Sequence, residues 1–531
     1  MFLLPIRRTL AAVVLVAVLG FARASPALDL TTATIKELNA ALDAGTVTSE
    51  QLVRLYLARI AAYDRAGPQL NAVMVINPKA LETAAALDAE RKAGKRRSAL
   101  HGIPIVVKDN IDTADLPTTA GSFMLKDSLP PDDAFVVQRL RQAGAIILAK
   151  TNMSEFASGP ALSSLGGRIR NPYNAARSPG GSSGGSGVAL AAAFAAAGLG
   201  TDTGGSVRVP AAANGIVGLK TTMGLISRDG VVPLALSFDT VGPMGRNVTD
   251  VAMLLGALAG VDPADPVTHT GEGKNAKDYA MSLDADALKG ARVGIARDFM
   301  GQNGDVDWVT EASLAAMRRA GANVIDVSFP KWLRETGVEW FTTVMNSEFR
   351  AQIQGYLATL DRRYPKTFDD LMGGAMALTA PDADGAIPNP GRWAEFVRPG
   401  APAPAPEDQV DAIRRLGLPH MRAVIEGVMH AERLDAIVYP TRARPFDLVD
   451  ATPDPLTGYR GPSFLVNLAG FAELVVPAGF TSHGMPVTMS FLGGAFSEPK
   501  LLALGYAFEQ RMNAYRLPAS TPPLPGEAIA P

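Results

Sequence analysis

Two glycine- and serine-rich clusters around an apolar segment constrain the fold of this 531-residue chain more than any other feature. The first cluster is Gly-Gly-Ser-Ser-Gly-Gly at residues 180–185, and the second is Thr-Gly-Gly-Ser at residues 203–206. Glycine lets a backbone turn sharply and be approached closely, so these serine hydroxyls are expected on tight, accessible turns. The segment between them, residues 188–198, is rich in alanine and predicts a buried helix. A flexible linker would instead join the clusters through polar residues.

The composition predicts a large folded core. Apolar residues make up 47% of the chain and charged residues 19%, a balance that argues against extensive disorder. Farther along, a strand pattern at residues 291–296, a helix pattern at 307–320 and a strand pattern at 322–327 predict a sheet covered by helices. The chain has no cysteine, which excludes disulfides, thiolate nucleophiles and cysteine-bound metals.

The first 24 residues have the pattern of a secretory signal. Two arginines precede an apolar run at residues 10–22, and Ala22-Arg23-Ala24 matches a small-x-small cleavage site. The alternative is a membrane anchor, but a run of 13 residues is shorter than the roughly 20 that span a bilayer. The paired Arg7-Arg8 is one element of a twin-arginine signal, but the flanking residues match that signal poorly, so the export route is not predicted. We therefore expect a secreted or periplasmic protein with no membrane span after cleavage.

The mature chain is mildly acidic. The whole chain has a net charge of −2, and removal of the leader takes away three arginines and no acid, which leaves −5. No block of basic residues is present, so the sequence gives no support for nucleic-acid binding.

The catalytic base for a serine nucleophile is not evident among the histidines. The five histidines, none in a recognisable catalytic context, are His101, His269, His420, His430 and His483. Residues 180–184 match the G-x-S-x-G turn of α/β-hydrolases, but residues 170–179 before them indicate a loop instead of the strand that this turn requires. An esterase that uses Ser182 and a histidine is therefore kept as an alternative.

Other chemistries lack their motifs. No lysine follows the glycines as in a phosphate-binding loop, the dinucleotide G-x-G-x-x-G pattern is absent from the clusters, and no H-E-x-x-H or compact His/Asp group suggests a metal. We expect neither metal nor cofactor. These exclusions leave serine paired with lysine.

Lys108 is the candidate base. The apolar run at residues 103–107 predicts a buried strand that places Lys108 among apolar groups, and burial lowers the pKa of a lysine. The alternative is an ion pair with Asp109 or Asp112, the commoner arrangement for a lysine at a strand end.

These motifs resemble the amidase signature family over nearly all of the mature chain, most strongly at residues 101–245. The matching features are a Lys-Asp-Asn strand end, Gly-Gly-Ser-Ser-Gly-Gly, and Gly-x-Gly-Thr-Asp-x-Gly-Gly-Ser, with 24 positions from Ser182 to Ser206. The resemblance implies a single α/β domain at residues 25–531 with a mixed central sheet and helices on both faces. It also implies a Ser-cisSer-Lys triad, with Ser206 as nucleophile, Ser182 as bridging serine and Lys108 as base.

Further roles follow from this resemblance. The peptide bond at Gly181-Ser182 is expected to be cis, and the backbone amides of the turn at residues 203–206 are candidates for the oxyanion hole. These amides belong to Thr203, Gly204, Gly205 and Ser206. The supporting or substrate-side residues are expected to be Met153, Ser154, Ser183, Asp202 and Arg208.

The substrate is defined only as an amide. The leader and the run at residues 491–500 are similar to exported bacterial peptide amidases, whereas Thr203-Gly204 is closer to the broader family. We expect residues 331–424 to form a pocket insertion, in which the Pro/Ala/Gly-rich stretch at 381–406 is a surface loop or a lid. A small or peptide amide is the expected partner, aryl amides and esters are alternatives, and a non-catalytic binding protein of the same fold stays open. The oligomeric state is not predicted.

Overall fold

A continuous mixed β-sheet forms the centre of the computed structural model, which describes residues 28–276, 278–378, 405–449 and 463–529. The sheet has 11 strands in the order β11-β10-β12-β14-β13-β8-β9-β7-β3-β4-β2. Their bounds are β2 Val73–Ile76, β3 Pro104–Lys108, β4 Ile146–Thr151, β7 Ala197–Asp202, β8 Val217–Lys220, β9 Thr240–Gly245, β10 Arg292–Ala296, β11 Asn323–Val327, β12 Ala436–Pro440, β13 Ala472–Phe480 and β14 Pro486–Gly493.

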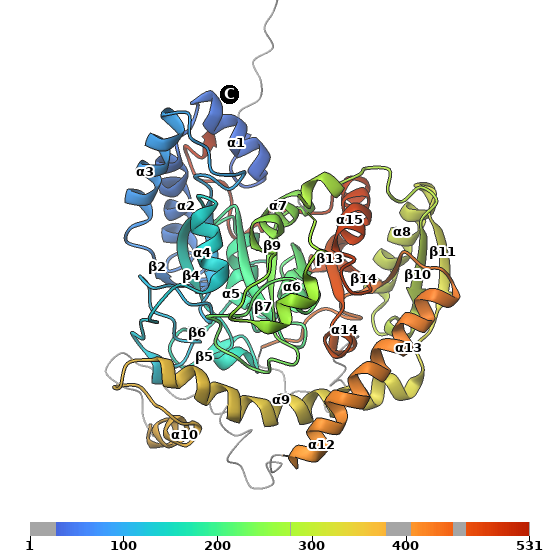
Figure 1. The fold of residues 1–531 in the computed structure, drawn as a ribbon. Helices are drawn as coiled ribbons and strands as arrows, with labels where there is room; N and C mark the ends of the chain where they lie inside the picture. The colour runs from blue at the N-terminus through green and yellow to red at the C-terminus, as the bar shows by residue number, and fades with distance from the viewer. Residues whose placement is uncertain (1–27, 277, 379–404, 450–462, 530–531) are drawn as a thin grey trace, which may run out of the picture.

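The sheet combines parallel and antiparallel pairs. β3 is parallel to β4 and β7, and β10 is parallel to β11 and β12, while β7, β8 and β9 pair antiparallel with one another or with β13. Helices flank the sheet (Figure 1), so the predicted fold class is confirmed. The helices are α1 Ile35–Ala44, α2 Ser49–Tyr63, α3 Ala80–Lys92, α4 Phe135–Gln142, α5 Gly184–Ala191, α6 Arg208–Ala213, α7 Val248–Leu258, α8 Gly304–Arg319, α9 Lys331–Thr359, α10 Phe368–Ala377, α12 Glu407–Ala412, α13 Leu418–Ala431, α14 Ser463–Ala469 and α15 Glu498–Met512.

The helix predicted at residues 188–198 is wrong in its bounds. Helix α5 begins inside the first glycine cluster and ends at Ala191, and the chain then enters the central strand β7 at Ala197. Ala193 adopts a φ of 54°, a left-handed conformation that interrupts the helix. Small residues suit both elements, because a Cβ on Gly198 would lie 2.7 Å from Val106 Cγ2 on the neighbouring strand. Composition alone could not separate a close-packed helix from a close-packed strand.

The long helix α9 carries a second hydrophobic core. It runs along one side of the molecule beneath α14 (Figure 1), and its buried residues include Phe341, Met345 and Phe349. These side chains join one apolar cluster with Phe238 from the loop before β9 and Phe464 from α14. Helix α9 thereby packs against α14, and its Phe341 side chain reaches Gly204, just after the end of β7.

Two sequence-based expectations fall on residues outside those that the structure describes. They are the signal at residues 1–24 and most of the stretch at 381–406. Within the described ranges, no helix is long and apolar enough to cross a membrane.

Candidate active site

Two parallel strand ends meet at the candidate active site. Strand β3 ends at Lys108 and its neighbour β7 ends at Asp202, and parallel strands end at the same edge of a sheet. The Lys108 side chain is fully buried, and its Nζ lies 2.8 Å from Ser182 Oγ and 2.7 Å from Thr201 Oγ1. The structure thus brings two of the three predicted triad residues into hydrogen-bond contact.

The environment of Lys108 favours its neutral form. Burial lowers the pKa of Lys108 to about 7, although the carboxylates of Asp202 and Asp239 act in the opposite direction. A lysine with this pKa is neutral in a large fraction of molecules at neutral pH, and a neutral amine can accept a proton.

The alternative ion pair of Lys108 with Asp109 or Asp112 is not formed. Asp109 faces a different buried lysine, with 3.8 Å between Lys150 Nζ and Asp109 Oδ1. Asp112 accepts a hydrogen bond of 2.8 Å from the Tyr356 hydroxyl of α9. The charges that follow Lys108 in sequence therefore have other partners.

The two serine clusters lie side by side. The Gly181-Ser182 peptide bond is cis, and the Ser183 amide donates a hydrogen bond of 3.2 Å to the carbonyl oxygen of Ser206. Ser182 is buried, Ser206 is half-buried, and both line one cavity of about 530 Å³. The Ser206 hydroxyl makes no hydrogen bond within the described ranges. The two serines are therefore related by the backbone hydrogen bond next to them and by the cavity that both line.

The wall of the cavity combines apolar and aromatic side chains with hydroxyl, amide and guanidinium groups. Helix α9 contributes Phe341, Thr342, Met345 and Asn346, so the segment expected to form the pocket does reach it. A Cβ on Gly204 would lie 2.6 Å from Phe341 Cζ, which requires glycine at this position. The remaining lining residues are Ala157, Ser158, Gly159, Pro160, Ala161, Ser178, Gly180, Gly181, Ser182, Thr203, Ser206, Val209, Leu234, Arg442, Phe446 and Phe464.

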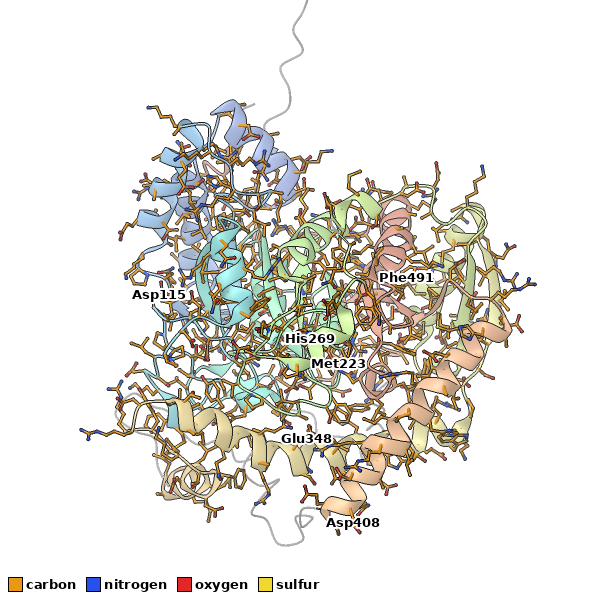
Figure 2. The ribbon with its side chains drawn as sticks, in the orientation of Figure 1. Asp115, Met223, His269, Glu348, Asp408 and Phe491 are labelled. Carbon is orange, nitrogen blue, oxygen red and sulfur yellow. The ribbon has the colours of Figure 1, made fainter. Side chains whose placement is uncertain are left out.

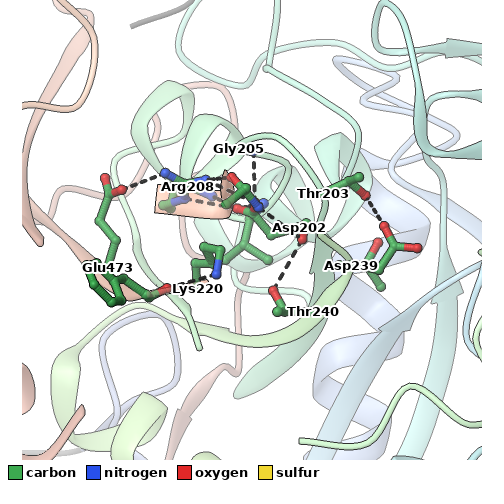
Figure 3. A network of polar contacts seen from close by, with 12 residues as sticks. Asp202, Thr203, Gly205, Arg208, Lys220, Asp239, Thr240 and Glu473 are labelled. Carbon is green, nitrogen blue, oxygen red and sulfur yellow. Dashed lines mark hydrogen bonds and ion pairs between the residues drawn. The ribbon is translucent and has the colours of Figure 1, made fainter. Parts of the chain in front are cut away.

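One backbone amide of the turn predicted as an oxyanion hole is already hydrogen-bonded within the protein. The Gly205 amide donates to Asp202 Oδ1 at 2.8 Å, so Gly205 is not available to a substrate (Figure 3). The amides of Thr203, Gly204 and Ser206 make no hydrogen bond to any residue that the structure describes, and all three residues line the cavity. The structure thereby narrows the candidate donors to these three.

Asp202 and Arg208 brace this turn, as expected for supporting residues. Arg208 Nη2 lies 3.0 Å from Asp202 Oδ1, and Arg208 Nη1 lies 2.5 Å from Glu473 Oε2 on β13 (Figure 3). Asn467 Nδ2 also donates to Asp202 Oδ1 at 3.0 Å. Although burial raises the pKa of Asp202, the Arg208 guanidinium outweighs that effect and holds the pKa well below its usual range. Asp202 is therefore an ionised anchor and not an acid–base group.

Ser183 acts on the backbone of β7. Its hydroxyl donates to the Thr201 carbonyl oxygen and accepts from the Thr201 amide, each at 3.2 Å. Thr201 Oγ1 in turn accepts from Lys108 Nζ and, at 3.1 Å, from Asn110 Nδ2. Ser183 thus helps to hold the residue that positions the lysine.

Met153 and Ser154 do not line the cavity. The Met153 side chain is buried in the apolar cluster of α9, and the Ser154 amide donates to the Ser182 carbonyl oxygen at 3.0 Å. Their loop does reach the cavity, but through residues 157–161. Neighbours of the two named residues line the cavity, and a substrate-side role of this loop stays a prediction.

The histidines lie away from the cavity. His101 is buried, with its Nε2 3.0 Å from the Leu87 carbonyl oxygen, and the other four are exposed. None of the five lines the cavity, and residues 170–179 before the turn at 180–184 form no strand. Both observations argue against the esterase alternative with a Ser182–histidine pair.

Several residues of the site were missed from the sequence. Thr201 stands inside the second motif and could have been noticed as a polar neighbour of the lysine. Asp239, Asn467 and Glu473 lie far from the motifs in sequence, and no local pattern marks them. Within the described ranges, no three histidine or acidic side chains are grouped so that they could hold a metal ion.

Comparisons with known proteins agree with this geometry. The family model described as Amidase matches residues 51–502. The native peptide amidase from Stenotrophomonas maltophilia is 39% identical with a TM-score of 0.81, over 92% of this chain and 99% of that chain. An amidase family protein from Bacillus anthracis str. Ames is 31% identical with a TM-score of 0.80, over 92% of both chains. A glutamyl-tRNA(Gln) amidotransferase subunit from Ralstonia pickettii (strain 12J) is 36% identical over 508 residues, 92% of this chain and 100% of the relative. The chain belongs to the amidase family.

Proposed function

We propose that this amidase hydrolyses a carboxamide through an acyl-enzyme on Ser206. The observation that carries the proposal is the fully buried Lys108, whose Nζ lies 2.8 Å from the Ser182 hydroxyl at the cavity wall. A serine hydroxyl needs a proton acceptor before it attacks a carbonyl carbon. Neutral Lys108 supplies that acceptor, and Ser182 relays the proton because it stands between the lysine and the cavity.

The proposed steps conserve the proton. Ser206 Oγ attacks the amide carbon while its proton passes to Ser182 and the Ser182 proton passes to Lys108. Amides among those of Thr203, Gly204 and Ser206 stabilise the oxyanion, and a missing donor of this kind costs about 2.7–4 kcal/mol in other enzymes. Ser182 then returns a proton to the leaving nitrogen, so the amine departs and the acyl group stays on Ser206. Water repeats the sequence in reverse and releases the acid.

We propose a peptide amide with an apolar residue beside the scissile bond as the substrate. The support is the cavity wall, which includes Phe341, Phe446 and Phe464 together with Leu234 and Met345. None of the described residues that line the cavity carries a carboxylate. Burial of one aromatic or aliphatic side chain favours binding by about 1.5–3 kcal/mol. The similarity to a protein named peptide amidase agrees with this class.

The test of the proposed reaction is turnover combined with labelling of Ser206. We expect release of ammonia from peptide amides to exceed hydrolysis of anilides, simple esters and free glutamine. A fluorophosphonate probe should label Ser206 in peptide maps, and Ser206→Ala should abolish both labelling and turnover. A label on Ser182 with full activity in Ser206→Ala would contradict the proposal, and labelling without any turnover would favour a binding protein.

We also propose that the protein is exported. The support is the leader at residues 1–24, which a glutamyl-tRNA-linked role would not require. Cell fractionation followed by N-terminal sequencing should find a periplasmic or secreted protein that begins at Ser25. A variant without residues 2–24 should stay in the cytoplasm. An unprocessed full-length chain in the cytoplasm would contradict export and would make the similarity to the glutamyl-tRNA(Gln) amidotransferases the better guide to function.

A further inference from the structure

The loop before β9 connects the candidate oxyanion turn to a buried carboxylate. Asp239 is buried, and its Oδ1 accepts a hydrogen bond of 2.5 Å from Thr203 Oγ1 (Figure 3). Asp239 Oδ2 accepts from the amides of Leu234 and Ala235, each at 2.9 Å. One carboxylate therefore fixes both the loop at residues 234–239 and the side chain of Thr203, a residue of the cavity wall.

The same loop is fastened to helix α9 by a second buried carboxylate. Glu348 lies on α9 (Figure 2) and is 3% exposed. It accepts hydrogen bonds from the Ser237 amide, at 3.0 Å, and from the Ser237 hydroxyl. Arg414 Nε lies 2.8 Å from Glu348 Oε1 and balances its charge. The Leu236 amide donates to Gln352 Oε1, one turn farther along α9, at 2.8 Å. The loop therefore follows the position of α9.

Helix α9 also contacts the turn directly. The Phe341 ring stacks on Phe238 of the loop, with 5.2 Å between ring centroids, and contacts the tilted ring of Phe464, with 4.4 Å between centroids. The space that a Cβ on Gly204 would need is filled by Phe341. The helix, the loop and the turn thus form one packed unit, and α9 contributes four side chains of this unit to the cavity wall.

We propose that Asp239 and Glu348 are positioning residues: Asp239 holds Thr203 so that the amides of the turn face the cavity, and Glu348 transmits the position of α9 to that turn. The inference rests on the proposed acyl-enzyme reaction and adds residues that nothing in the motifs indicates. It also assigns a physical path by which contact of a bulky acyl group with α9 affects the chemical step.

The physical reason is the geometry that an oxyanion hole requires. Donors stabilise the oxyanion only when they already point at its position, and a displacement of about 1 Å can cost about 100-fold in rate. The Thr203 hydroxyl donates its proton to Asp239 and cannot also donate to a substrate, so we infer that its contribution is to the orientation of its own backbone. A substitution in this unit should therefore lower kcat more than it raises KM.

The first test compares Thr203→Val with Thr203→Ser. Valine has the shape of threonine but lacks the hydroxyl, whereas serine keeps the bond to Asp239. We expect Thr203→Val to lower kcat by at least about tenfold with KM changed less than about threefold, and Thr203→Ser to restore most of the loss. Equal activity of Thr203→Val and wild type would overturn the role of Asp239.

The second test uses the pH profile of Asp239→Asn. Asp202 and Asp239 both face Lys108 and raise its pKa, while Arg228 and Lys108 are the cations near Asp239. Removing one carboxylate should move the acid limb of kcat/KM to lower pH. Thr203→Val retains the Asp239 charge and should leave the limb in place. A limb that is unchanged in Asp239→Asn would contradict an electrostatic effect of this carboxylate on Lys108.

The third test addresses Glu348 through its partner Ser237. Ser237→Ala removes the hydroxyl hydrogen bond to Glu348. Ser482→Ala is a matched control, because Ser482 is exposed and its hydroxyl also donates to a carboxylate, that of Asp305. We expect Ser237→Ala to lower kcat for an aromatic peptide amide by at least about threefold and for a short aliphatic amide by clearly less. The control should change neither.

The outcomes separate this inference from the proposed function. If Ser206→Ala retains turnover, the proposed reaction fails whatever the positioning variants do. If Ser206→Ala is inactive while Ser237→Ala lowers kcat equally for both substrates, the reaction stands and the transmission through Glu348 is wrong. In each variant that retains Ser206, fluorophosphonate labelling measures the fraction of enzyme that is folded and reactive. Each rate is divided by this fraction.

Discussion

Replacing Lys108 by methionine is expected to lower kcat/KM by at least about 10⁴-fold, the size of effect seen when a member of a serine-enzyme catalytic group is removed. Methionine fills nearly the same volume in the buried site but cannot accept a proton. Ser182 and Ser206 then lack a base, so attack on the amide carbon fails. The variant should remain folded, because a buried amine that is replaced by an apolar group leaves only Thr201 and Ser182 without one neighbour each.

The pH dependence of the wild-type enzyme gives the same assignment. Burial lowers the pKa of Lys108 to about 7, and in the proposed mechanism the neutral amine is the active form. Activity should therefore be low below pH 7 and rise with pH through an apparent pKa near that value, as Lys108 loses its proton. Hydrolysis rates over pH 5–9 measure the limb, which the residual activity of Lys108→Met should not show.

The matched controls are single replacements of the five histidines by glutamine. Since none of these side chains lines the cavity, each variant should keep activity per folded molecule, as measured by near-ultraviolet circular dichroism together with turnover. A histidine variant that loses activity as completely as Lys108→Met would reinstate the esterase alternative. More than about 1% of wild-type kcat/KM in Lys108→Met would contradict the role of lysine as the base.

Replacing Arg208 by methionine is expected to reduce the free energy of unfolding by about 3–5 kcal/mol, the cost of breaking a buried ion pair by removal of one partner. Arg208 is 0% exposed and contacts the carboxylates of both Asp202 and Glu473. Without the guanidinium, two negative charges stay buried and repel each other. The second motif depends on the same contacts, since Asp202 also binds the amides of Gly205 and Val207.

Equilibrium unfolding in urea measures this loss, with Arg54→Met as the control. Arg54 pairs with Glu50 on the surface, where the two side chains are 60% and 39% exposed, so its removal should cost less than about 1 kcal/mol. The pKa of Asp202 is lowered in the folded protein, so its contribution to stability is present above about pH 4 and decreases as the pH falls below that value. Equal stability of the two variants at pH 7 would show that Arg208 does not hold the turn.

The sequence predicted the parts of the site that lie within motifs. Lys108 at the end of a buried strand and the two serine clusters were identified because their chemistry and spacing are local properties of the chain. The mixed sheet was predicted through the family resemblance, and the structure confirms it. The helix between the clusters was placed too far along, because alanine and glycine at residues 191–200 suit a packed helix and a packed strand equally well.

The rest of the site depends on contacts between distant parts of the chain. Asp239, Glu348 and Glu473 are acidic residues outside any motif, and only the folded chain shows that each receives donors from another element. Gly205 is a further example. The motif suggests that its amide faces a substrate, but in the folded chain this amide donates to Asp202. Motifs identify reactive groups, whereas their orientation comes from tertiary partners.

The brace around Arg208 has a consequence for the order in which the enzyme matures. Its guanidinium is neutralised partly by Glu473, and Asp202 is held partly by Asn467, both from the last strands and helices to leave the ribosome. A growing or translocating polypeptide that already contains every reactive side chain still lacks these late contributors. We therefore expect competence to cleave amides to be acquired only near the completion of synthesis, when these contacts can form.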